Sequence, residues 1–282
     1  MSEKSLTYEV YVSSQLPTTV TDTPPDLDRR MWSPTSSTLI QGARDAVLVD
    51  PLMAIDQVHD LLEWVAQRGK RLVAVYITHG HGDHWFGLAE VLRRHPGAKA
   101  LAMPAVVERM RAQADPETFQ GFWRKRFPGQ IASDLVLAQA MEDSTIELEG
   151  HALRAIPLGH TDTDDSTCLH VPSIGLVVAG DAVYNNVHLF LAESPAPKRR
   201  EWLAALDRLE ALEPTAVVAG HKDPSLGDSP QAIDLTRQYI ADFEQLARST
   251  STATELYEGM IALHPTRINR GALWGSARFE KG

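Results

Sequence analysis

The chain of 282 residues contains a single cysteine, Cys168, so no disulfide can form within it. Such scarcity is typical of proteins from a reducing compartment. No apolar run reaches the roughly 18 residues of a membrane span. The first seven residues, Met-Ser-Glu-Lys-Ser-Leu-Thr, lack the apolar core of a secretory signal. These absences predict a soluble, cytoplasmic protein with no membrane partner.

An excess of basic residues is missing as well. The chain has 27 Lys and Arg against 37 Asp and Glu, a formal net charge of −10, and the acids are scattered. Nonspecific binding to nucleic acid depends on basic surface, so the charge argues against a nucleic-acid partner. With 43% hydrophobic residues, the chain can bury one large core but is short for two enzyme domains. We therefore expect a single domain over residues 1–282.

Apolar patterns of two kinds alternate along the chain. Short runs with strand character and stretches with a helical period predict an α/β fold, with helices outside sheets. Two further helices form a helical excursion at about 104–143, and a helical C-terminal region is expected from about 231. Strand patterns occur at 6–12, 38–40, 46–49, 72–77, 144–148, 153–158, 174–179 and 215–219, and helical patterns at 55–68, 85–94, 105–114, 117–127, 198–212 and 231–247.

Metal-ligand residues follow four of the predicted strands. The hexapeptide His-Gly-His-Gly-Asp-His at 79–84 comes directly after the apolar run 72–77. The three later runs end in Gly-His160, Gly-Asp181 and Gly-His221. Taken singly, His160, Asp181 and His221 would each be interpreted as a turn or surface residue. Their common position at strand ends favours a shared site, because ligands of α/β folds bind at the carboxyl ends of strands.

The spacing within the hexapeptide suits metal binding. In an extended segment residues i and i+2 point to the same side, so His79 and His81 can bind one ion together. Asp83 and His84, at the next bend, can turn toward a second ion. Neutral imidazole and carboxylate are common zinc ligands. We therefore expect two divalent ions per chain, with zinc favoured and manganese or iron as alternatives.

These residues resemble the signature of the metallo-β-lactamase superfamily of binuclear metallohydrolases. The hexapeptide matches its His-x-His-x-Asp-His motif, and the pairs Gly159-His160, Gly180-Asp181 and Gly220-His221 follow in the expected order. The resemblance spans about residues 36–222. It implies a four-layer αββα sandwich with the metal site at one edge.

The resemblance also implies which residue serves which ion. His79, His81 and His160 would hold the first ion; Asp83, His84 and His221 would hold the second; Asp181 would bridge them. The true lactamases commonly use a cysteine for one ion. Cys168 lies within a segment and not at a strand end, so it is not assigned as a ligand.

The same set predicts a hydrolase of a small organic molecule. Two ions can bridge a hydroxide that attacks an electrophilic carbonyl, with Asp83 and Asp181 as the catalytic carboxylates. Esters, lactones and thioesters are the expected substrates. Alternatives are a hydrolytic dehalogenase of an activated aromatic, a mononuclear iron persulfide dioxygenase, which needs fewer ligands, and a non-enzymatic metal-binding scaffold.

Substrate contacts are predicted from position alone. Trp85 and Phe86 follow the hexapeptide, and Tyr184, Asn186 and His188 follow Asp181. Core packing or an ordinary turn is the competing interpretation for each.

Three further features remain open from the sequence. Asp50 either orients a ligand histidine or forms the turn before Pro51. The aromatics of the excursion either cover the site or pack into the core. The N-terminal strand and the C-terminal region either complete the sandwich or form a homodimer contact.

Overall fold

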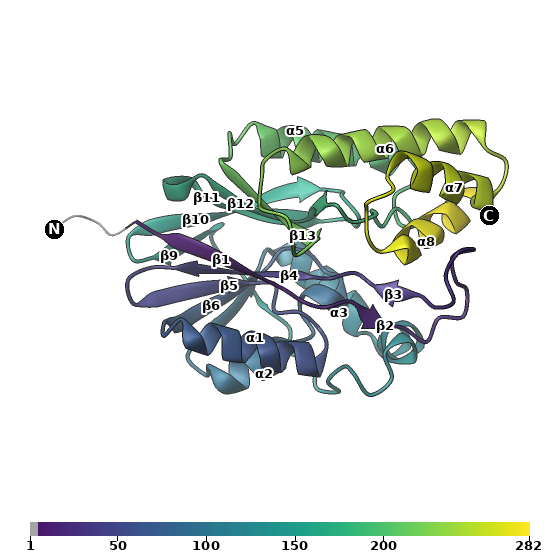
Figure 1. Ribbon diagram of the computed structural model, residues 1–282. Coiled ribbons are helices and arrows are strands. Elements are labelled where there is room, and N and C mark those ends of the chain that lie inside the picture. The colour runs from purple at the N-terminus through teal and green to yellow at the C-terminus, as the bar shows by residue number, and fades with distance from the viewer. Residues whose placement is uncertain (1–4) are drawn as a thin grey trace.

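Two β-sheets face each other at the centre of the computed structural model, which describes residues 5–282 (Figure 1). The first sheet contains, in spatial order, β1 (Thr7–Val12), β4 (Ser36–Gln41), β5 (Asp45–Val49), β6 (Arg71–Ile77), β7 (Lys99–Ala102) and β8 (Gln139–Ala140). The second contains β13 (Ala216–Lys222), β12 (Leu176–Asn185), β11 (Ser166–Val171), β10 (His151–Gly159) and β9 (Thr145–Leu148).

Helices cover the outer face of each sheet. In Figure 1, α1 and α2 lie against the first sheet, and α5 and α6 lie against the second, on the opposite side of the molecule. The first sheet is covered by α1 (Ile55–Gln67), α2 (Leu88–Arg94) and α3 (Pro104–Ala114), and the second by α5 (Ala196–Glu210) and α6 (Ala232–Ser249). Two further helices pack beside α6, α7 (Ala253–Leu263) against α6 and α8 (Arg270–Lys281) against α7. The predicted αββα sandwich is confirmed.

The alternation of side chains along a strand builds the layers. In β5, Ala46 and Leu48 pack under the helices, whereas Val47 and Val49 face the second sheet. Val178 of β12 belongs to the same central layer between the sheets. Because both faces of these strands are covered, their sequences are apolar throughout and do not alternate with polar residues.

The strand before Asp181 is longer than its sequence pattern indicates. A strand ending at residue 179 is expected, yet β12 continues to Asn185 through a bulge at Gly180. Gly180 has φ +54, and a Cβ there would lie 2.6 Å from the Thr78 hydroxyl oxygen. The bulge turns Asp181 toward the end of β6, where the hexapeptide begins.

The helical excursion packs against the N-terminal segment. After α3 come α4 (Pro116–Thr118) and a six-residue π-helix, η2 (Phe119–Arg124), before the chain returns to β8. The small sheet of β2 (Leu16–Pro17) and β3 (Met31–Trp32) lies beside it, and Thr19 N–H donates to the Arg126 carbonyl at 3.1 Å. The two segments form one side of the site.

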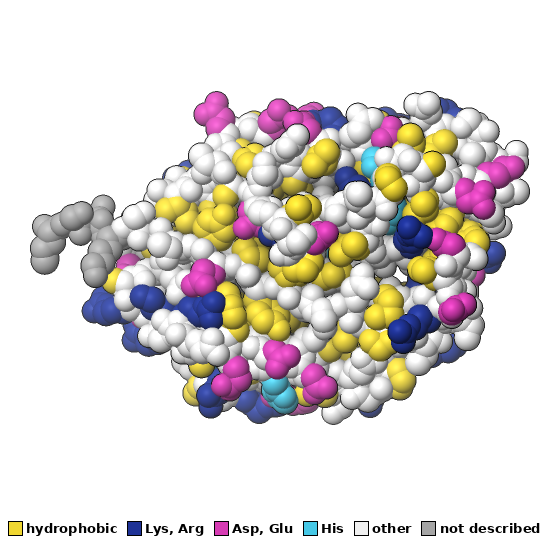
Figure 2. Space-filling model, in the orientation of Figure 1, with side chains coloured by type: hydrophobic (Ala, Val, Ile, Leu, Met, Phe, Trp, Pro, Cys, Tyr) yellow, Lys and Arg dark blue, Asp and Glu magenta, His cyan; other side chains and the backbone are white. Residues whose placement is uncertain are grey.

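The remaining surface is mixed in charge. Acidic and basic side chains both occur across the face shown in Figure 2, with apolar side chains between them. No helix within residues 5–282 is both long enough and apolar enough to cross a membrane.

Candidate metal centre

Six of the seven predicted ligands meet at one edge of the sandwich. His79 and His81 follow β6, Asp83 and His84 lie in the short 3₁₀-helix η1 (Gly82–His84), and the other two come from the second sheet. Those two are Asp181 in β12 and His221 in β13. β12 and β13 are parallel neighbours, so their side chains arrive together at the same edge.

Asp83, His84 and His221 form one compact, buried group. The Asp83 Oδ2 atom lies 3.4 Å from His221 Nε2 and 3.8 Å from His84 Nε2. Asp181 joins them, with its oxygens 3.1 Å from His221 Nε2 and 3.2 Å from His84 Nε2. Ligands of a tetrahedral zinc ion at 2.0–2.2 Å are about 3.3–3.6 Å apart, so these spacings suit one ion.

His79 and His81 form a second group with Asp162, a residue not predicted as a ligand. Asp162 Oδ2 lies 2.7 Å from His81 Nδ1 and 3.8 Å from His79 Nε2. Asp162 could have been proposed as a ligand from the sequence, because it lies in the polar loop directly after His160. Sequence reasoning assigned only the histidine at that strand end.

His160 is buried but is turned away from both groups. Its Nδ1 lies 2.8 Å from Asp164 Oδ1, and its Nε2 lies 2.9 Å from Ser194 Oγ. A histidine that binds metal usually has a carboxylate on its other nitrogen, so Asp164 matches that pattern. The structure therefore leaves His160 outside the six clustered donors.

Hydrogen-bond partners on the Nδ1 atoms of two of the imidazoles, those of His84 and His221, hold these rings in place. Asp50 accepts from the Thr78 backbone N–H at 2.9 Å and from its hydroxyl at 2.7 Å, and lies 3.0 Å from His84 Nδ1. His221 Nδ1 lies 2.8 Å from the Pro34 carbonyl. Asp50 thus occupies the position expected of a residue that orients a ligand.

Several buried polar atoms of the two groups make no well-oriented hydrogen bond within residues 5–282, although two of them, Asp162 Oδ2 and Asp181 Oδ1, lie in ion-pair contact with imidazole nitrogens. Such atoms are costly inside a protein unless something satisfies them. They are His79 Nε2, His84 Nε2, Asp162 Oδ2 and Asp181 Oδ1. All four belong to the residues that would surround the ions, so the donor set fits two divalent cations.

Electrostatics within the groups favours charged carboxylates. Burial acts to raise the pKa of Asp83, but the imidazoles of His84 and His221 outweigh it and hold that pKa well below its usual range. Burial lowers the pKa of His79. Burial also acts to lower the pKa of His81, His84 and His221, but Asp162 beside His81 and Asp181 beside the other two outweigh it and raise those pKa values. Ionised carboxylates and neutral imidazoles are the forms that bind metal.

Two aromatic side chains position the carboxylates. Trp32 Nε1 donates to Asp83 Oδ2 at 2.9 Å, and the Tyr184 hydroxyl donates to Asp181 Oδ2 at 2.8 Å. Gly220 leaves room beside Asp181, because a Cβ there would lie 2.0 Å from Asp181 Oδ1. Tyr184, one of the residues predicted to contact substrate, lines the cavity beside these carboxylates. Trp32 was not predicted from the sequence, because 51 residues separate it from Asp83.

The other predicted substrate contacts lie outside the cavity. Trp85 and Phe86 are buried under the first sheet, where Phe86 packs edge-on against Trp123. His188 is fully buried 3.0 Å from the Tyr239 hydroxyl, and burial lowers its pKa to about 3. Asn186 donates to Asp223, the residue directly after β13. Chain proximity to a ligand does not determine where these side chains point.

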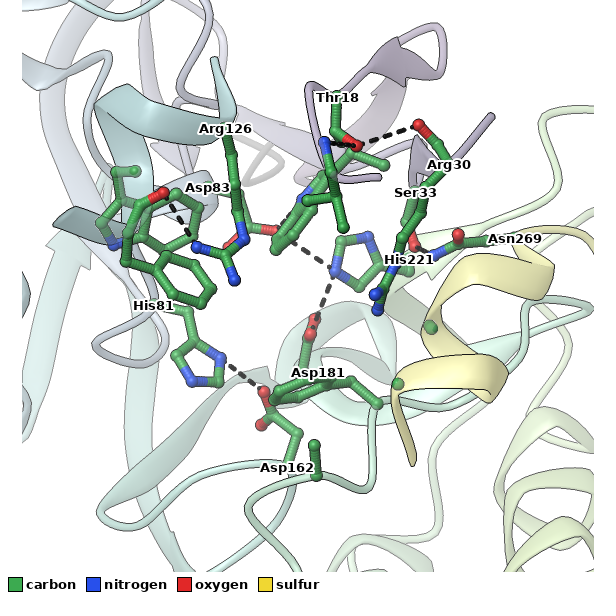
Figure 3. A pocket seen from close by; sticks show the side chains of 18 of the residues that line it. Thr18, Arg30, Ser33, His81, Asp83, Arg126, Asp162, Asp181, His221 and Asn269 are labelled. Atoms are coloured by element: carbon green, nitrogen blue, oxygen red, sulfur yellow. Dashed lines mark hydrogen bonds and ion pairs between the residues drawn. The ribbon is translucent and has the colours of Figure 1, made fainter. Parts of the chain in front are cut away.

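A cavity of about 480 Å³ opens over the two metal-ligand groups (Figure 3). Its floor includes His81, Asp83, Asp162, Asp181 and His221. One wall is aromatic and is built by Trp32 with Phe122 and Trp123 of the excursion. The excursion therefore forms part of the site and also packs into the core, where Phe119, Trp123 and Phe127 are buried.

The family model of the metallo-beta-lactamase superfamily matches residues 30–221, more than half of the chain. The chain therefore belongs to the metallo-β-lactamase superfamily. It is similar in structure to a metallo-beta-lactamase family protein from Thermus thermophilus, with a TM-score of 0.63, 23% identity, and coverage of 96% of this chain and 91% of that one. A metallo-beta-lactamase from Pontibacter korlensis aligns with a TM-score of 0.59, 17% identity and coverage of 83% and 100%.

Curated relatives share part of the sequence. A hydroxyacylglutathione hydrolase of Synechococcus sp. (strain JA-3-3Ab) is 30% identical over 179 residues, which are 63% of this chain and 58% of that protein. The hydroxyacylglutathione hydrolase of Parasynechococcus marenigrum (strain WH8102) is 30% identical over 185 residues, 63% and 62% respectively. The aligned region thus spans less than two thirds of these relatives.

Proposed function

We propose that this protein is a metal-dependent hydrolase of a small thioester or ester, with two divalent ions, most simply Zn²⁺. The observation that carries the proposal is the meeting of two buried His/Asp groups on the floor of one cavity. The superfamily and the relatives named as hydroxyacylglutathione hydrolases support hydrolysis, with thioesters as the first class to test.

Each ion has its own donors. His79 and His81 would hold the first ion together with a donor from the loop that carries His160 and Asp162. Asp83, His84 and His221 would hold the second, and Asp181 would lie between them. Ions bound there would lower the pKa of a shared water toward neutrality and polarise a substrate carbonyl.

The chain's own residues prepare the site for this reaction. Trp32 holds Asp83, and Asp50 holds His84, so neither ligand needs to reorganise when the site is used. The Tyr184 hydroxyl holds one oxygen of Asp181 and leaves the other free. The aromatic wall of Trp32, Phe122 and Trp123 displaces water next to the cavity floor.

The decisive experiment is metal analysis combined with turnover of S-acyl thioesters, with and without chelator. We expect about two zinc per chain and chelator-sensitive hydrolysis. His84→Ala should lose about one metal equivalent and reduce kcat/KM by roughly 100-fold or more, because it removes a ligand of the second ion.

The matched control is His59→Ala, which removes a histidine whose side chain is 57% exposed on α1. It should keep both metals and full activity. Full turnover by His84→Ala would contradict the site. A single iron per chain without hydrolysis would point to the dioxygenase alternative.

A further inference from the structure

Two arginines line the cavity on the side facing the metal-ligand residues. Arg30 lies in the loop before β3, and Arg126 lies just after η2, so 96 residues of chain separate them. In Figure 3 both side chains extend into the cavity from the side opposite Asp162 and Asp181. We refer to Arg30 and Arg126 as the arginine pair.

The arginine pair is held by the backbone and by packing. Thr18 N–H donates to the Arg30 carbonyl and Thr19 N–H to the Arg126 carbonyl, both at 3.1 Å, so two adjacent residues tie the arginines together. The Arg126 guanidinium stacks on the Phe122 ring at 3.5 Å and donates to the Phe122 carbonyl at 3.1 Å. Both side chains are thus placed before any ligand arrives.

Helix α8 gives Arg30 its path into the cavity. Gly271 and Gly275 are four residues apart and share one face of the helix. A Cβ at Gly271 would lie 2.7 Å from Arg30 Cγ, and a Cβ at Gly275 would lie 2.5 Å from Arg30 Nη2. The side chain therefore lies across a face that only glycine leaves open.

Neither arginine has an acidic partner within residues 5–282. No carboxylate oxygen of the described chain lies within 4.0 Å of either guanidinium. Asp22 is the acid whose charge acts on Arg30, but its carboxylate accepts a hydrogen bond from Trp274 Nε1, at 3.0 Å, and not from Arg30. Burial lowers the pKa of Arg30; the charge of Asp22 opposes this effect and that of Arg126 adds to it.

Partly buried guanidiniums without an acidic partner are costly and are rarely kept without a use. The acids of the cavity do not act as partners of the arginines, because two divalent ions would offset the charges of Asp83, Asp162, Asp181 and Glu193. With ions bound, the arginine pair is surplus positive charge at the open side of the site. Planar guanidiniums suit carboxylate and phosphate oxygens.

We propose that Arg30 and Arg126 bind an anionic group on the non-reacting part of the substrate, which selects thioesters or esters ending in a carboxylate or phosphate. This inference rests on the proposed hydrolase function. It assigns the cavity two ends: the metal-ligand groups receive the reacting carbonyl, and the arginine pair receives the anion.

The first test compares two thioesters that differ only in charge, S-acetyl-3-mercaptopropionate and S-acetyl-3-mercaptopropionamide. Arg30→Gln and Arg126→Gln should each lower kcat/KM for the anionic substrate by about tenfold to a hundredfold, the range for losing a charged hydrogen bond. The neutral substrate should change by less than about threefold. Equal losses for both substrates would overturn the proposal.

Two variants separate position from charge. Gly275→Ala keeps every charge and suits a helix better than glycine, but its methyl displaces the Arg30 guanidinium; we expect it to lose the preference for the anionic substrate. Arg29→Gln removes the same charge from an exposed neighbour that does not line the cavity, and it should keep the preference. Loss of preference in Arg29→Gln would indicate a general charge effect and overturn the assignment.

Binding without turnover distinguishes this proposal from the hydrolase proposal. Titration calorimetry on the metal-loaded protein should show tighter binding of glutarate than of its monomethyl ester, and Arg30→Gln should abolish the difference. 4-Phosphonobutyrate in a third titration shows whether carboxylate or phosphate oxygens fit better. If the protein hydrolyses no thioester but still prefers glutarate in an Arg30-dependent way, the hydrolase proposal fails and the anion-binding role of the arginine pair stands. If glutarate and its monomethyl ester bind equally well, the anion-binding role of the arginine pair is contradicted.

Discussion

At the scale of single residues, the loop after β10 carries two donors for one position. Asp162 contacts His79 and His81, whereas His160 contacts Asp164 and Ser194. Both side chains are buried. The choice between them would determine whether an ion held by His79 and His81 has a neutral or a charged third ligand, and with it how strongly that ion would polarise a bound water.

A matched pair of variants identifies this donor. Because Asp162 is the residue in contact with His79 and His81, we expect Asp162→Ala to bind about one metal per chain and His160→Ala to bind about two. Zinc content after dialysis gives the count. The reverse result would show that His160 turns from Ser194 to bind the ion, as the family signature implies.

Most of the clustered donors could be predicted because a motif and a strand end coincide at their positions, with His160 as the exception. His79, His81, Asp83 and His84 carry a signal in their spacing, and the structure gathers them with Asp181 and His221. Asp50 was predicted only as one of two possibilities. Residues that reach the site from distant loops, such as Trp32 and Arg30, have no pattern of their own because their neighbours in space are not their neighbours in sequence.

At the scale of elements, one carboxylate links the two sheets at their turns. Glu149, in the turn between β9 and β10, accepts backbone N–H groups of Ala43, Arg44 and Asp45 at 2.7–2.8 Å. Ala43 and Arg44 lie in the turn between β4 and β5, and Asp45 begins β5. The N–H groups of Arg44, Asp45 and Ala43 lower the pKa of Glu149 from 4.5 to about 2.

This contact predicts a pH effect on stability. Since the folded-state pKa of Glu149 lies below its unfolded value, the contact stabilises the protein above pH 4.5 and is lost as the pH falls toward 2. In Glu149→Gln, the free energy of unfolding should therefore fall less between pH 5 and about pH 2. Urea unfolding at several pH values measures this. Glu147→Gln, an exposed position on β9, should behave as wild type; an equal effect there would refute the role of Glu149.

The helices were predictable in proportion to their amphipathic pattern. Helix α1 begins and ends within one residue of its predicted range because its apolar positions recur with a helical period. Helix α7 lies in a weakly patterned region, but Thr252 and Glu255 form a capping box that marks its start. The bulge that extends β12 depends on contact with Thr78, so it had no local signal.

At the scale of the whole molecule, the candidate metal centre joins donors from both sheets. Its donors come from the segment after β6, from the bulged middle of β12 and from β13, and the bridge between Thr35 and His221 joins the sheets beside it. Buried polar atoms from both sheets make no well-oriented hydrogen bond within residues 5–282 and would be satisfied by the ions. Ion binding should therefore stabilise the folded state as a whole.

Thermal unfolding with and without metal tests this coupling. A ligand at 100 times its Kd adds about 2.7 kcal/mol per site, which corresponds to a rise in Tm of roughly 5–10 °C. We expect chelator-treated protein to gain Tm in steps as zinc is added, and His84→Ala to show about half of the total gain. An unchanged Tm on zinc addition would contradict a centre shared by the two sheets.

The sequence by itself determined the α/β class and the chemistry of the donor set, because periodicity and strand-end motifs are local properties, and the resemblance of its motif to the superfamily implied the αββα sandwich. Tertiary structure decided which donors share an ion, which loop residue faces them and what lines the cavity above. The physical reason is distance along the chain. Contacts such as Trp32 with Asp83 or Pro34 with His221 form only when whole layers pack, and no local pattern encodes them.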